Sequence, residues 1–489
     1  MKNININLIY IKLNNFKNIK NGEISFNKNN KHFFNDNGKL CNDCEAPRSK
    51  IIGLYGPNGS GKTAVITAID LLKKVMSGNS IKNNQEYYHY IYCNEERATL
   101  SFIFLLEFDS NKYLVSYKFT LSKKYNSKLL YNYADIDSEE LSYKLLKKND
   151  RENVLIEYDN SISEEPNNNI FSGKLYNNFS YLNEKQKIEI MVIKGLSEKQ
   201  NTSFCFHNDF LTFLESSDII LKNDKFKILK NILNFLSEFA ISHLFVMTKN
   251  DLGLISLDAL LPFNFHAFTN EHELFAGNIG LSLNGKNVWP ETVLEAFKVI
   301  INQINITLKH IIPNLLLEIK DLNNDEFNEK MEKTKKFEIL AVKNDISIPL
   351  KYESDGTKKI IALLNVITAL YNNPNIFLAV DELDSGIFEY LLGELLSILE
   401  NRIEGRLLFT SHNLVILEQL NVESLRFSTT DENNRFVSYM GLKDNNNLRS
   451  VYLRQLKLGN DDDKIDFYSK PDKYEIAYAL KKAGEIKYE

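Results

Sequence analysis

The sequence has little of what several classes of protein require. Its 489 residues include only 4 Cys, 9 Pro and 20 Gly. So few cysteines cannot form the disulfide framework of a small secreted protein, and a reducing cytoplasm is the expected compartment. The low glycine and proline counts exclude a collagen-like or low-complexity chain. No apolar run reaches the roughly 18 residues that a membrane helix needs, and the first residues lack the apolar core of an export signal, so we expect no membrane partner.

What is present is typical of a globular protein. Hydrophobic residues make up 43% of the chain, aromatic residues 11% and charged residues 25%, with a net charge of -5. This composition supplies enough apolar material for a packed core and excludes disorder as the main state. The nearly balanced charge gives no overall argument for nucleic-acid binding, although a local basic face would be compatible with it.

The apolar pattern predicts an α/β protein. Residues 51–55 form an apolar stretch that leads into a glycine-rich turn and then a helical repeat through residue 75. Residues 98–106 and 113–121 are rich in strand formers and predict an antiparallel hairpin. Later, the all-apolar stretches 376–380 and 406–410 alternate with helical patterns, as the strands of a parallel sheet do.

The middle of the chain has a different character. Long helical periodicity runs through 219–239 and 291–312, the second ending before Pro313, and Asn-rich stretches separate such segments. Sustained heptads are absent, so a long coiled-coil arm is not expected. We therefore predict an N-terminal part at 1–125, an inserted, mainly helical lobe at 126–335, and a C-terminal part at 336–489.

The clearest chemical signal lies at residues 56–63, which fit the phosphate-loop pattern G-x-x-x-x-G-K-[ST] between a predicted strand and helix. Glycines let successive N–H groups turn inward as an anion-binding nest at the helix N-terminus. Lys62 can then reach the β- and γ-phosphates, and the Thr63 hydroxyl can ligate Mg²⁺. A chance glycine-rich loop is the alternative. The residues assigned to nucleotide binding are Gly56, Asn58, Gly59, Ser60, Gly61, Lys62 and Thr63.

Two acids follow the apolar strand 376–380. A carboxylate at this end of a central strand lies beside the phosphate loop, so Asp381 can hold the Mg²⁺ shell and Glu382 can activate the attacking water. The alternative is a pair of acids that end a strand at the surface. His412 follows the next buried strand in the same way and can sense a γ-phosphate, although a lone histidine is usually structural.

The segment 353–359 opens a helix with Ser354, Asp355 and Gly356, all suited to capping. A simple cap explains this pattern. A second anion site would also explain it, with the Ser354 hydroxyl, the amide of Gly356 and the helix dipole directed at a γ-phosphate that need not belong to the same chain.

In this order the motifs resemble those of ABC-type ATPase heads: Walker A, a signature at 354–357, Walker B with its glutamate at 381–382, a D-loop at Asp384 and the switch His412. The opening Asn15-Phe16-Lys17-Asn18-Ile19 is similar to the soluble branch that includes RecF, the chromosome-maintenance ATPases and OLD-like proteins. The closest resemblance is to the OLD-related ATPases of bacterial phage defence, such as those of the PARIS and AbiL-type abortive-infection systems.

The resemblance implies a P-loop NTPase fold of the ABC-head type, with a mixed central sheet and an antiparallel β subdomain. It implies a cytoplasmic ATP hydrolase that uses ATP and Mg²⁺, with Glu382, Lys62 and His412 as catalytic residues and Thr63 and Asp381 on the metal. Two heads of a homodimer or higher homo-oligomer would sandwich ATP, with Ser354 and Gly356 of one chain facing Lys62 of the other. Nucleotide state would control a separate, Toprim-like effector nuclease, with a phage protein as trigger.

Two other functions stay open. One is a DNA-repair ATPase resembling RecF, in which ATP closes the dimer on duplex DNA, and the other is a slow or inactive ATPase that serves as a scaffold. Asp355 stands where transporters have glycine, which argues against a transporter subunit. No secure Q-loop glutamine is found, since Gln85 is a poor candidate.

Three further patterns are set aside. Residues 248–251 mimic a guanine-reading loop, but they precede the Mg²⁺-binding acid instead of following it, so we interpret them as a strand-to-turn coincidence. Cys41 and Cys44 have zinc-ligand spacing without a second pair, and a solvent loop is preferred. The acidic run 461–463 could suggest a nuclease centre, but a solvated loop is the better interpretation because too little chain follows His412 for a Toprim domain.

Overall fold

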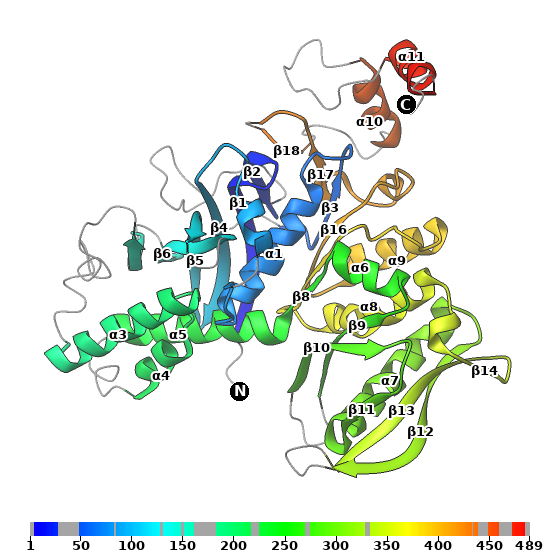
Figure 1. Ribbon diagram of the computed structural model, residues 1–489, viewed down its shortest axis with the longest axis horizontal. Helices are drawn as coiled ribbons and strands as arrows, with labels where there is room; N and C mark the ends of the chain where they lie inside the picture. Colours follow the sequence, from blue (N-terminus) through cyan, green and yellow to red (C-terminus); the bar gives the residue numbers. More distant parts are fainter. Residues whose placement is uncertain are drawn as a thin grey trace.

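The computed structural model describes residues 4–27, 48–82, 85–127, 131–147, 151–160, 182–216, 224–268, 274–327, 333–432, 434–438, 448–458 and 472–484. Its centre is a six-stranded sheet of order β18-β17-β3-β16-β15-β8 (Figure 1). All neighbours in it are parallel except the edge strand β18. The strands are β3 (Ile51–Tyr55), β8 (Leu244–Met247), β15 (Phe377–Val380), β16 (Arg406–Thr410), β17 (Leu425–Ser428) and β18 (Phe436–Val437).

Three of these strands were predicted from their apolar runs. Strands β3, β15 and β16 are buried at every position, as strands covered on both faces must be. They are also in close register, with Leu54 opposite Thr410 and Phe409 opposite Val380. The loops that follow them therefore leave the sheet at one edge, and this edge carries the predicted chemical residues.

A second sheet is entirely antiparallel, in the order β2-β1-β4-β5-β6-β7. The hairpin predicted at 98–106 and 113–121 is its β4–β5 pair. Helix α1 (Lys62–Met76) lies between the two sheets and is buried along most of its length (Figure 1). The strands are β1 (Asn5–Phe16), β2 (Ile19–Ser25), β4 (Arg97–Phe108), β5 (Asn111–Asn126), β6 (Tyr131–Leu145) and β7 (Asn153–Asp159).

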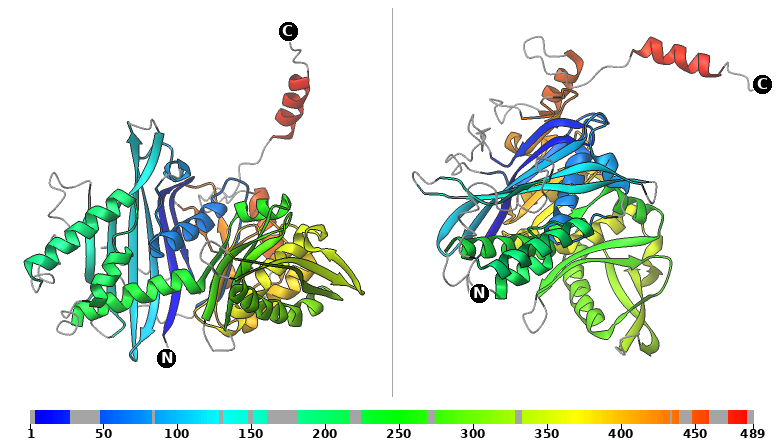
Figure 2. Two further views of the ribbon diagram at one scale, coloured as in Figure 1. Left: turned by 60° about the horizontal axis from the view of Figure 1, so that its bottom comes forward. Right: turned by 60° about the vertical axis from the view of Figure 1, so that its left-hand side comes forward.

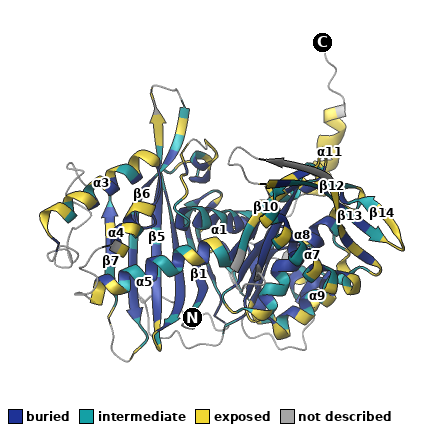
Figure 3. Cartoon of the chain, turned by 90° about the horizontal axis from the view of Figure 1, so that it is seen from below, coloured by how far each residue is buried: buried dark blue, intermediate teal, exposed yellow. Residues whose placement is uncertain are grey.

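Three helices lie against this antiparallel sheet: α3 (Glu184–Gln200), α4 (Asn208–Ser216) and α5 (Asp224–Glu238) (Figure 2). Aromatic rings join the layers, since Phe108 of β4 meets Phe235 of α5 at a centroid distance of 5.2 Å. The inner strands of both large sheets are mostly buried (Figure 3).

One carboxylate in the antiparallel sheet is completely enclosed. Glu139 of β6 is only 1% exposed. It accepts hydrogen bonds from the hydroxyls of Tyr117 and Tyr158, both at 2.6 Å, from the Phe204 N–H at 2.7 Å, and from the Ser203 hydroxyl. Four donors thus satisfy both oxygens, and the carboxylate ties the segment before α4 to the sheet.

The middle of the chain differs from the mainly helical lobe that the sequence predicted. Helices α3, α4, α5 and α7 (Glu291–Ile311) are present, but strands β6 and β7 extend the antiparallel sheet and β8 is an edge of the parallel one. Two further small sheets follow. One pairs β9 (Leu260–Phe268) with β10 (Leu274–Ser282), and the other contains β11 (Asn287–Pro290), β12 (Leu315–Phe327), β13 (Lys333–Lys343) and β14 (Ile346–Pro349).

The helical prediction failed here because charged and polar residues interrupt the strands. β6 carries Asp135, Asp137 and Glu139, and β12 ends in a polar run, so neither shows apolar alternation. The helix expected at 291–312 is confirmed as α7. The division at residues 125 and 335 stays a prediction.

The far side of the parallel sheet is covered by α6 (Lys249–Ser256), α8 (Asp355–Asn372) and α9 (Glu389–Arg402). Helices α10 (Leu448–Leu458) and α11 (Lys473–Gly484) complete the described chain. Within the described ranges, every helix is too short or too polar to cross a bilayer.

Candidate active site

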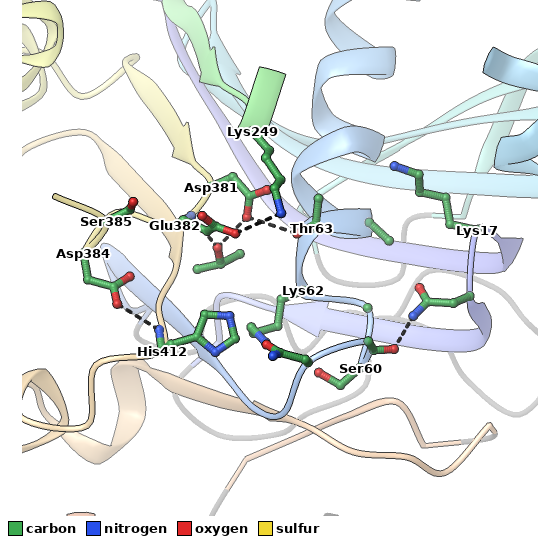
Figure 4. A pocket seen from close by; sticks show the side chains of 16 residues that line it. Lys17, Ser60, Lys62, Thr63, Lys249, Asp381, Glu382, Asp384, Ser385 and His412 are labelled. Atoms are coloured by element: carbon green, nitrogen blue, oxygen red, sulfur yellow. Dashed lines mark hydrogen bonds and ion pairs between the residues drawn. The ribbon is translucent and has the colours of Figure 1, made fainter. Parts of the chain in front are cut away.

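Most of the predicted residues meet in one pocket at the carboxyl edge of the parallel sheet (Figure 4). Its volume is about 870 Å³, large enough for a nucleoside triphosphate. It is lined by the phosphate loop, by the residues that follow β15 and β16, and by two less expected segments. The lining residues are Lys17, Asn18, Asn58, Gly59, Ser60, Gly61, Lys62, Thr63, Ala64, Lys249, Asp381, Glu382, Asp384, Ser385, Thr410 and His412.

The phosphate loop joins β3 to α1 in a conformation that requires glycine. Gly61 is the N-cap of α1 and has φ 96°, and a Cβ there would lie 2.9 Å from the Ile19 side chain. The Asn18 amide donates a hydrogen bond to the Gly59 carbonyl, and the Ser60 hydroxyl donates one to the Pro57 carbonyl at 2.7 Å. The loop is therefore held from outside and from within, and helix α1 directs its N-terminus into the pocket.

Lys62 is a buried cation that folds back onto this loop. It is 6% exposed, and its Nζ donates to the carbonyls of Gly56 and Pro57 at 2.8 and 2.9 Å. Gly56 itself supports the loop from behind and does not line the pocket. Burial lowers the pKa of Lys62 to about 8, against the opposing effect of nearby acids, chiefly Asp381. An anionic phosphate would stabilise this charge.

Asp381 is fully buried and only partly hydrogen-bonded. Its Oδ1 accepts from the Thr410 hydroxyl at 2.6 Å and from the Thr63 hydroxyl at 3.3 Å, whereas Oδ2 has no partner. A buried carboxylate oxygen without a donor is costly unless a cation meets it. Thr63 and Asp381 therefore fit Mg²⁺, which takes few protein ligands when phosphates and water supply the rest. No group of three or more His, Cys, Asp or Glu in the described part of the chain forms a separate metal cage.

Glu382 has a backbone conformation that is uncommon outside glycine, with φ 47°. Its N–H donates to the Thr410 hydroxyl at 2.8 Å, so a single threonine fixes both acids at the end of β15. The Glu382 carboxylate lies 3.5 Å from Lys249 Nζ and is partly open to the pocket. It is thus placed where it can meet a water molecule inside the cavity (Figure 4).

Lys249 also lines the pocket, although the 248–251 pattern was interpreted as a strand-to-turn coincidence. It opens α6, which begins with a capping box between Thr248 and Asp251, directly after β8. β8 pairs with β15 in parallel, with Met247 opposite Val380, so the next residues of both strands are neighbours. The available signal was an apolar run followed by a polar turn, the same pattern that revealed Asp381.

Lys17 and Asn18 were also missed as pocket residues, although they were used for the resemblance. They form the turn between β1 and β2, and Lys17 Nζ donates to the Thr67 hydroxyl at 3.0 Å. Burial lowers the pKa of Lys17. Only the packing of the antiparallel sheet against α1 brings this turn to the phosphate loop.

His412 lies at the pocket opposite the phosphate loop, with its backbone N–H donating to Asp384 Oδ2 at 3.2 Å (Figure 4). Burial lowers its pKa, and the Lys62 charge adds to this effect. At neutral pH the imidazole is therefore mainly neutral and can accept or donate a hydrogen bond.

Ser354 and Gly356 lie outside this pocket. Ser354 is exposed, and its hydroxyl accepts from the Thr357 N–H at 3.2 Å as the N-cap of α8. Gly356 packs on the loop after Asp384, where a Cβ would lie 1.9 Å from the Gly386 carbonyl oxygen. One chain therefore shows the cap and a close backbone contact, and the second anion site stays a prediction.

The weaker candidates are not part of the pocket. Gln85 begins the 3₁₀ helix η1 (Gln85–Tyr90) and is not among the lining residues. Cys205 is buried in the core, and Cys93 is exposed. Cys41, Cys44 and the acidic run 461–463 lie outside the described residues.

A family model matches residues 51–418, a range that contains the phosphate loop, the 354–357 turn, Asp381, Glu382 and His412. Its description is "AAA domain, putative AbiEii toxin, Type IV TA system". The chain belongs to this AAA family. No curated protein is similar enough to match.

Several solved structures resemble this AAA chain at low identity. One is the Smc head domain of Pyrococcus furiosus with an extended coiled coil, bound to the C-terminal domain of ScpA, at 14% identity, 89% coverage of this chain, 96% of that chain and a TM-score of 0.39. Others are the Smc head domain of Thermotoga maritima, at 12% identity, 88% and 99% coverage and 0.35, and the recombination mediator protein RecF-ATPrS of the RecFOR pathway, at 14% identity, 89% and 100% coverage and 0.35.

The fold of this AAA chain is an α/β fold in which the phosphate loop joins the parallel strand β3 to helix α1. The strand β16 lies between the strand before the phosphate loop and the strand that ends in Asp381, and an antiparallel sheet packs alongside. The predicted fold class is thus confirmed in its mixed central sheet and antiparallel β subdomain.

Proposed function

We propose that the protein is a Mg²⁺-dependent ATP hydrolase that works as a homodimer or higher oligomer and controls a separate effector in antiphage defence. The observation that carries the hydrolase proposal is the unpartnered, buried Oδ2 of Asp381 beside Thr63 and the phosphate loop. A purely structural sheet edge would have no reason to retain a buried acceptor without a donor.

In this proposal each residue performs a defined task. The N–H groups of the phosphate loop and Lys62 would hold the β- and γ-phosphates, and Thr63 and Asp381 would hold Mg²⁺, whose charge would offset that of the phosphate oxygens. Glu382 orients a water molecule and accepts its proton as the water oxygen attacks the γ-phosphorus and the bond to the β-phosphate oxygen breaks. His412, neutral at pH 7, donates a hydrogen bond to a γ-phosphate oxygen.

A second chain would complete the site. Ser354 is exposed, caps the N-terminus of α8 through its contacts with Thr357 and does not line its own pocket, so this helix N-terminus would be accessible to phosphate bound by another copy. ATP would then act as the bridge between two heads, and hydrolysis would release them. The role in defence is supported by the family description, which names a toxin and a toxin–antitoxin system.

The decisive experiment compares the wild type with Glu382→Gln. The amide cannot accept a proton, so we expect the hydrolysis rate to fall by about 10²- to 10³-fold while ATP still binds and dimers accumulate. Rates are measured by phosphate release, and mass by light scattering with ATP and Mg²⁺. Glu394→Gln, a change at an exposed position of α9, is the matched control and should leave both unchanged. Hydrolysis by Glu382→Gln at the wild-type rate would refute the assignment.

Lys62→Ala tests the phosphate grip independently. We expect ATP affinity to fall by about 10-fold or more, because the variant loses the buried cation that the phosphates would meet. The affinity is measured by titration with a fluorescent ATP analogue.

The effector proposal is tested by co-purification from the native host. A Toprim-like nuclease that is bound only in one nucleotide state would support it. Strong stimulation of hydrolysis by duplex DNA would favour a DNA clamp instead.

A further inference from the structure

The Glu382 loop is held by a lysine that no motif explains. Lys359 lies in the second turn of α8 and is 2% exposed. Its Nζ donates hydrogen bonds to three main-chain carbonyls, those of Glu382 at 2.6 Å, Leu383 at 3.1 Å and Ser385 at 3.2 Å. An ammonium group has three N–H donors, so this cluster of carbonyls uses all of them.

Burying this charge against neutral carbonyls is unfavourable in itself. Burial lowers the pKa of Lys359 to about 8, although the acids of the site, Asp384 first, act against the shift. A fold that needed only apolar contact here would be served better by leucine or methionine. The lysine therefore has a task that depends on donating hydrogen bonds to this loop.

The loop needs such support because Glu382 has φ 47°, a conformation that is strained for a residue other than glycine. Strain of this kind persists only where the surroundings fix the backbone from several sides. Here the Thr410 hydroxyl accepts from the Glu382 N–H, and Lys359 donates to the Glu382 carbonyl. The two contacts clamp the peptide groups on either side of the Glu382 Cα.

Lys359 also connects two parts of the site that lie apart in one chain. Ser354 caps the helix on which Lys359 lies, and Gly356 contacts the Gly386 carbonyl, so the first turns of α8 meet the 382–386 loop at two points. A displacement of the 354–357 turn would move this loop, and with it the carboxylate of Glu382.

We propose that Lys359 is a positioning residue, which fixes the strained backbone of Glu382 and links its carboxylate to the 354–357 turn. This inference rests on the proposed hydrolysis. When the turn of one chain meets phosphate bound by a second copy, the lysine transmits the contact to the glutamate of its own chain. The two sites of a dimer are then coupled through the α8 of each protomer.

The test uses Lys359→Met, which is one atom shorter than lysine, stays unbranched and removes the donors. In single turnover at saturating ATP we expect a rate loss of about 10- to 100-fold, with ATP affinity within about 3-fold of wild type. In a Glu382→Gln background the same change should cost less than about 3-fold, because Lys359 acts through that carboxylate. The proposal would be overturned if the rate losses of the two single variants multiplied in the double variant. It would also be overturned if Lys359→Met alone hydrolysed ATP at the wild-type rate.

Lys358→Met is the matched control. This neighbouring lysine is equally buried, but it pairs with Asp258 and Asp355 instead of the 382–386 loop. We expect it to lower the unfolding midpoint as much as Lys359→Met or more, with a hydrolysis rate within about 3-fold of wild type. Lys359→Gln, which retains one amide donor group, should lose less activity than Lys359→Met and covers the case in which the methionine variant fails to fold.

Hydrogen exchange supplies a readout that does not depend on hydrolysis. In Lys359→Met or Lys359→Gln the amides of 382–386 should exchange faster while those in the middle of α8 stay protected. Unchanged exchange in that loop would refute the positioning role even if the wild type hydrolyses no ATP. A wild type without hydrolysis, or an active Glu382→Gln, would instead refute only the proposed function.

Discussion

Two buried carboxylates in this molecule have opposite surroundings. Glu139, in the antiparallel sheet, is 1% exposed and accepts four hydrogen bonds from hydroxyls and a main-chain N–H. Asp381, at the edge of the parallel sheet, is 0% exposed, yet one of its oxygens has no donor. The difference separates a carboxylate that completes a fold from one that, in our proposal, would bind a cation, because a folded chain rarely retains a buried acceptor that nothing satisfies.

The same change, carboxylate to amide, should therefore have opposite consequences at the two positions. Glu139→Gln should have the largest effect on stability, lowering the free energy of unfolding by about 3 kcal/mol, since the amide nitrogen would face buried donors. Chemical denaturation measures the loss. The ATP affinity of the folded variant should stay within a few-fold of wild type. If Glu139→Gln were as stable as wild type, the contrast between Glu139 and Asp381 would not hold.

Asp381→Asn should show the converse. The retained Oδ1 still accepts from Thr410, so the stability of the nucleotide-free protein should change by no more than about 1 kcal/mol. Mg²⁺-dependent hydrolysis should fall by about 10²-fold, which corresponds to about 2.7 kcal/mol of activation free energy. A stability loss as large as that of Glu139→Gln would show that Asp381 is structural.

Two helical glycines, one beside the site and one away from it, allow the same comparison for a backbone contact. Gly356→Ala places a Cβ against the Gly386 carbonyl and should destabilise the protein by about 2 kcal/mol. Gly195→Ala on α3, where a Cβ would meet no atom within 4 Å, should stabilise it by about 0.5–1 kcal/mol. Thermal unfolding of both variants measures whether each change raises or lowers the stability. If Gly356→Ala were as stable as wild type, the contact with Gly386 would be loose.

The smallest effect is expected at Asp135, a half-buried acid on the same strand as Glu139. Burial raises its pKa to about 6, with Asp137 adding to the shift and Lys124 opposing it. Because the folded-state pKa lies above the unfolded value of 3.8, the group favours the folded state fully below pH 3.8, and this contribution is lost as pH rises through 6.

Asp135→Asn does not titrate, so its stability relative to wild type should improve as pH rises from 4 to 7. Urea midpoints of the two proteins at matched pH values measure this difference. A difference that stays constant with pH would indicate that Asp135 titrates in the folded protein as it does in the unfolded chain.

The parts of the site that could be predicted are those contained in short stretches of sequence. The phosphate loop is a local pattern between a strand and a helix, and Asp381 and Glu382 directly follow an apolar strand. Lys249 could not be assigned in this way. Its distance from Glu382 depends on β8 pairing with β15, and an apolar run of four residues does not reveal its partner.

The fold shows the same limit. Helix α7 was predicted because its periodicity reflects burial on one face, and the hairpin β4–β5 because both of its strands are rich in strand formers. Strand β6 was not, because its inward residues include Asp137 and Glu139, which are polar and become buried only through partners elsewhere in the chain. The strained geometry of Glu382 and its support by Lys359 arise from contacts between segments, so no local pattern encodes them.

The strand order also dictates when the phosphate loop can form during synthesis. β3 is flanked by β16 and β17, both from the last fifth of the chain. A ribosome that adds roughly 5–20 residues per second would need roughly 20–70 s to travel from one to the other. Throughout that interval both edges of β3 lack their partners. A nascent chain would therefore lack the sheet that positions the phosphate loop until β16 and β17 have been synthesised.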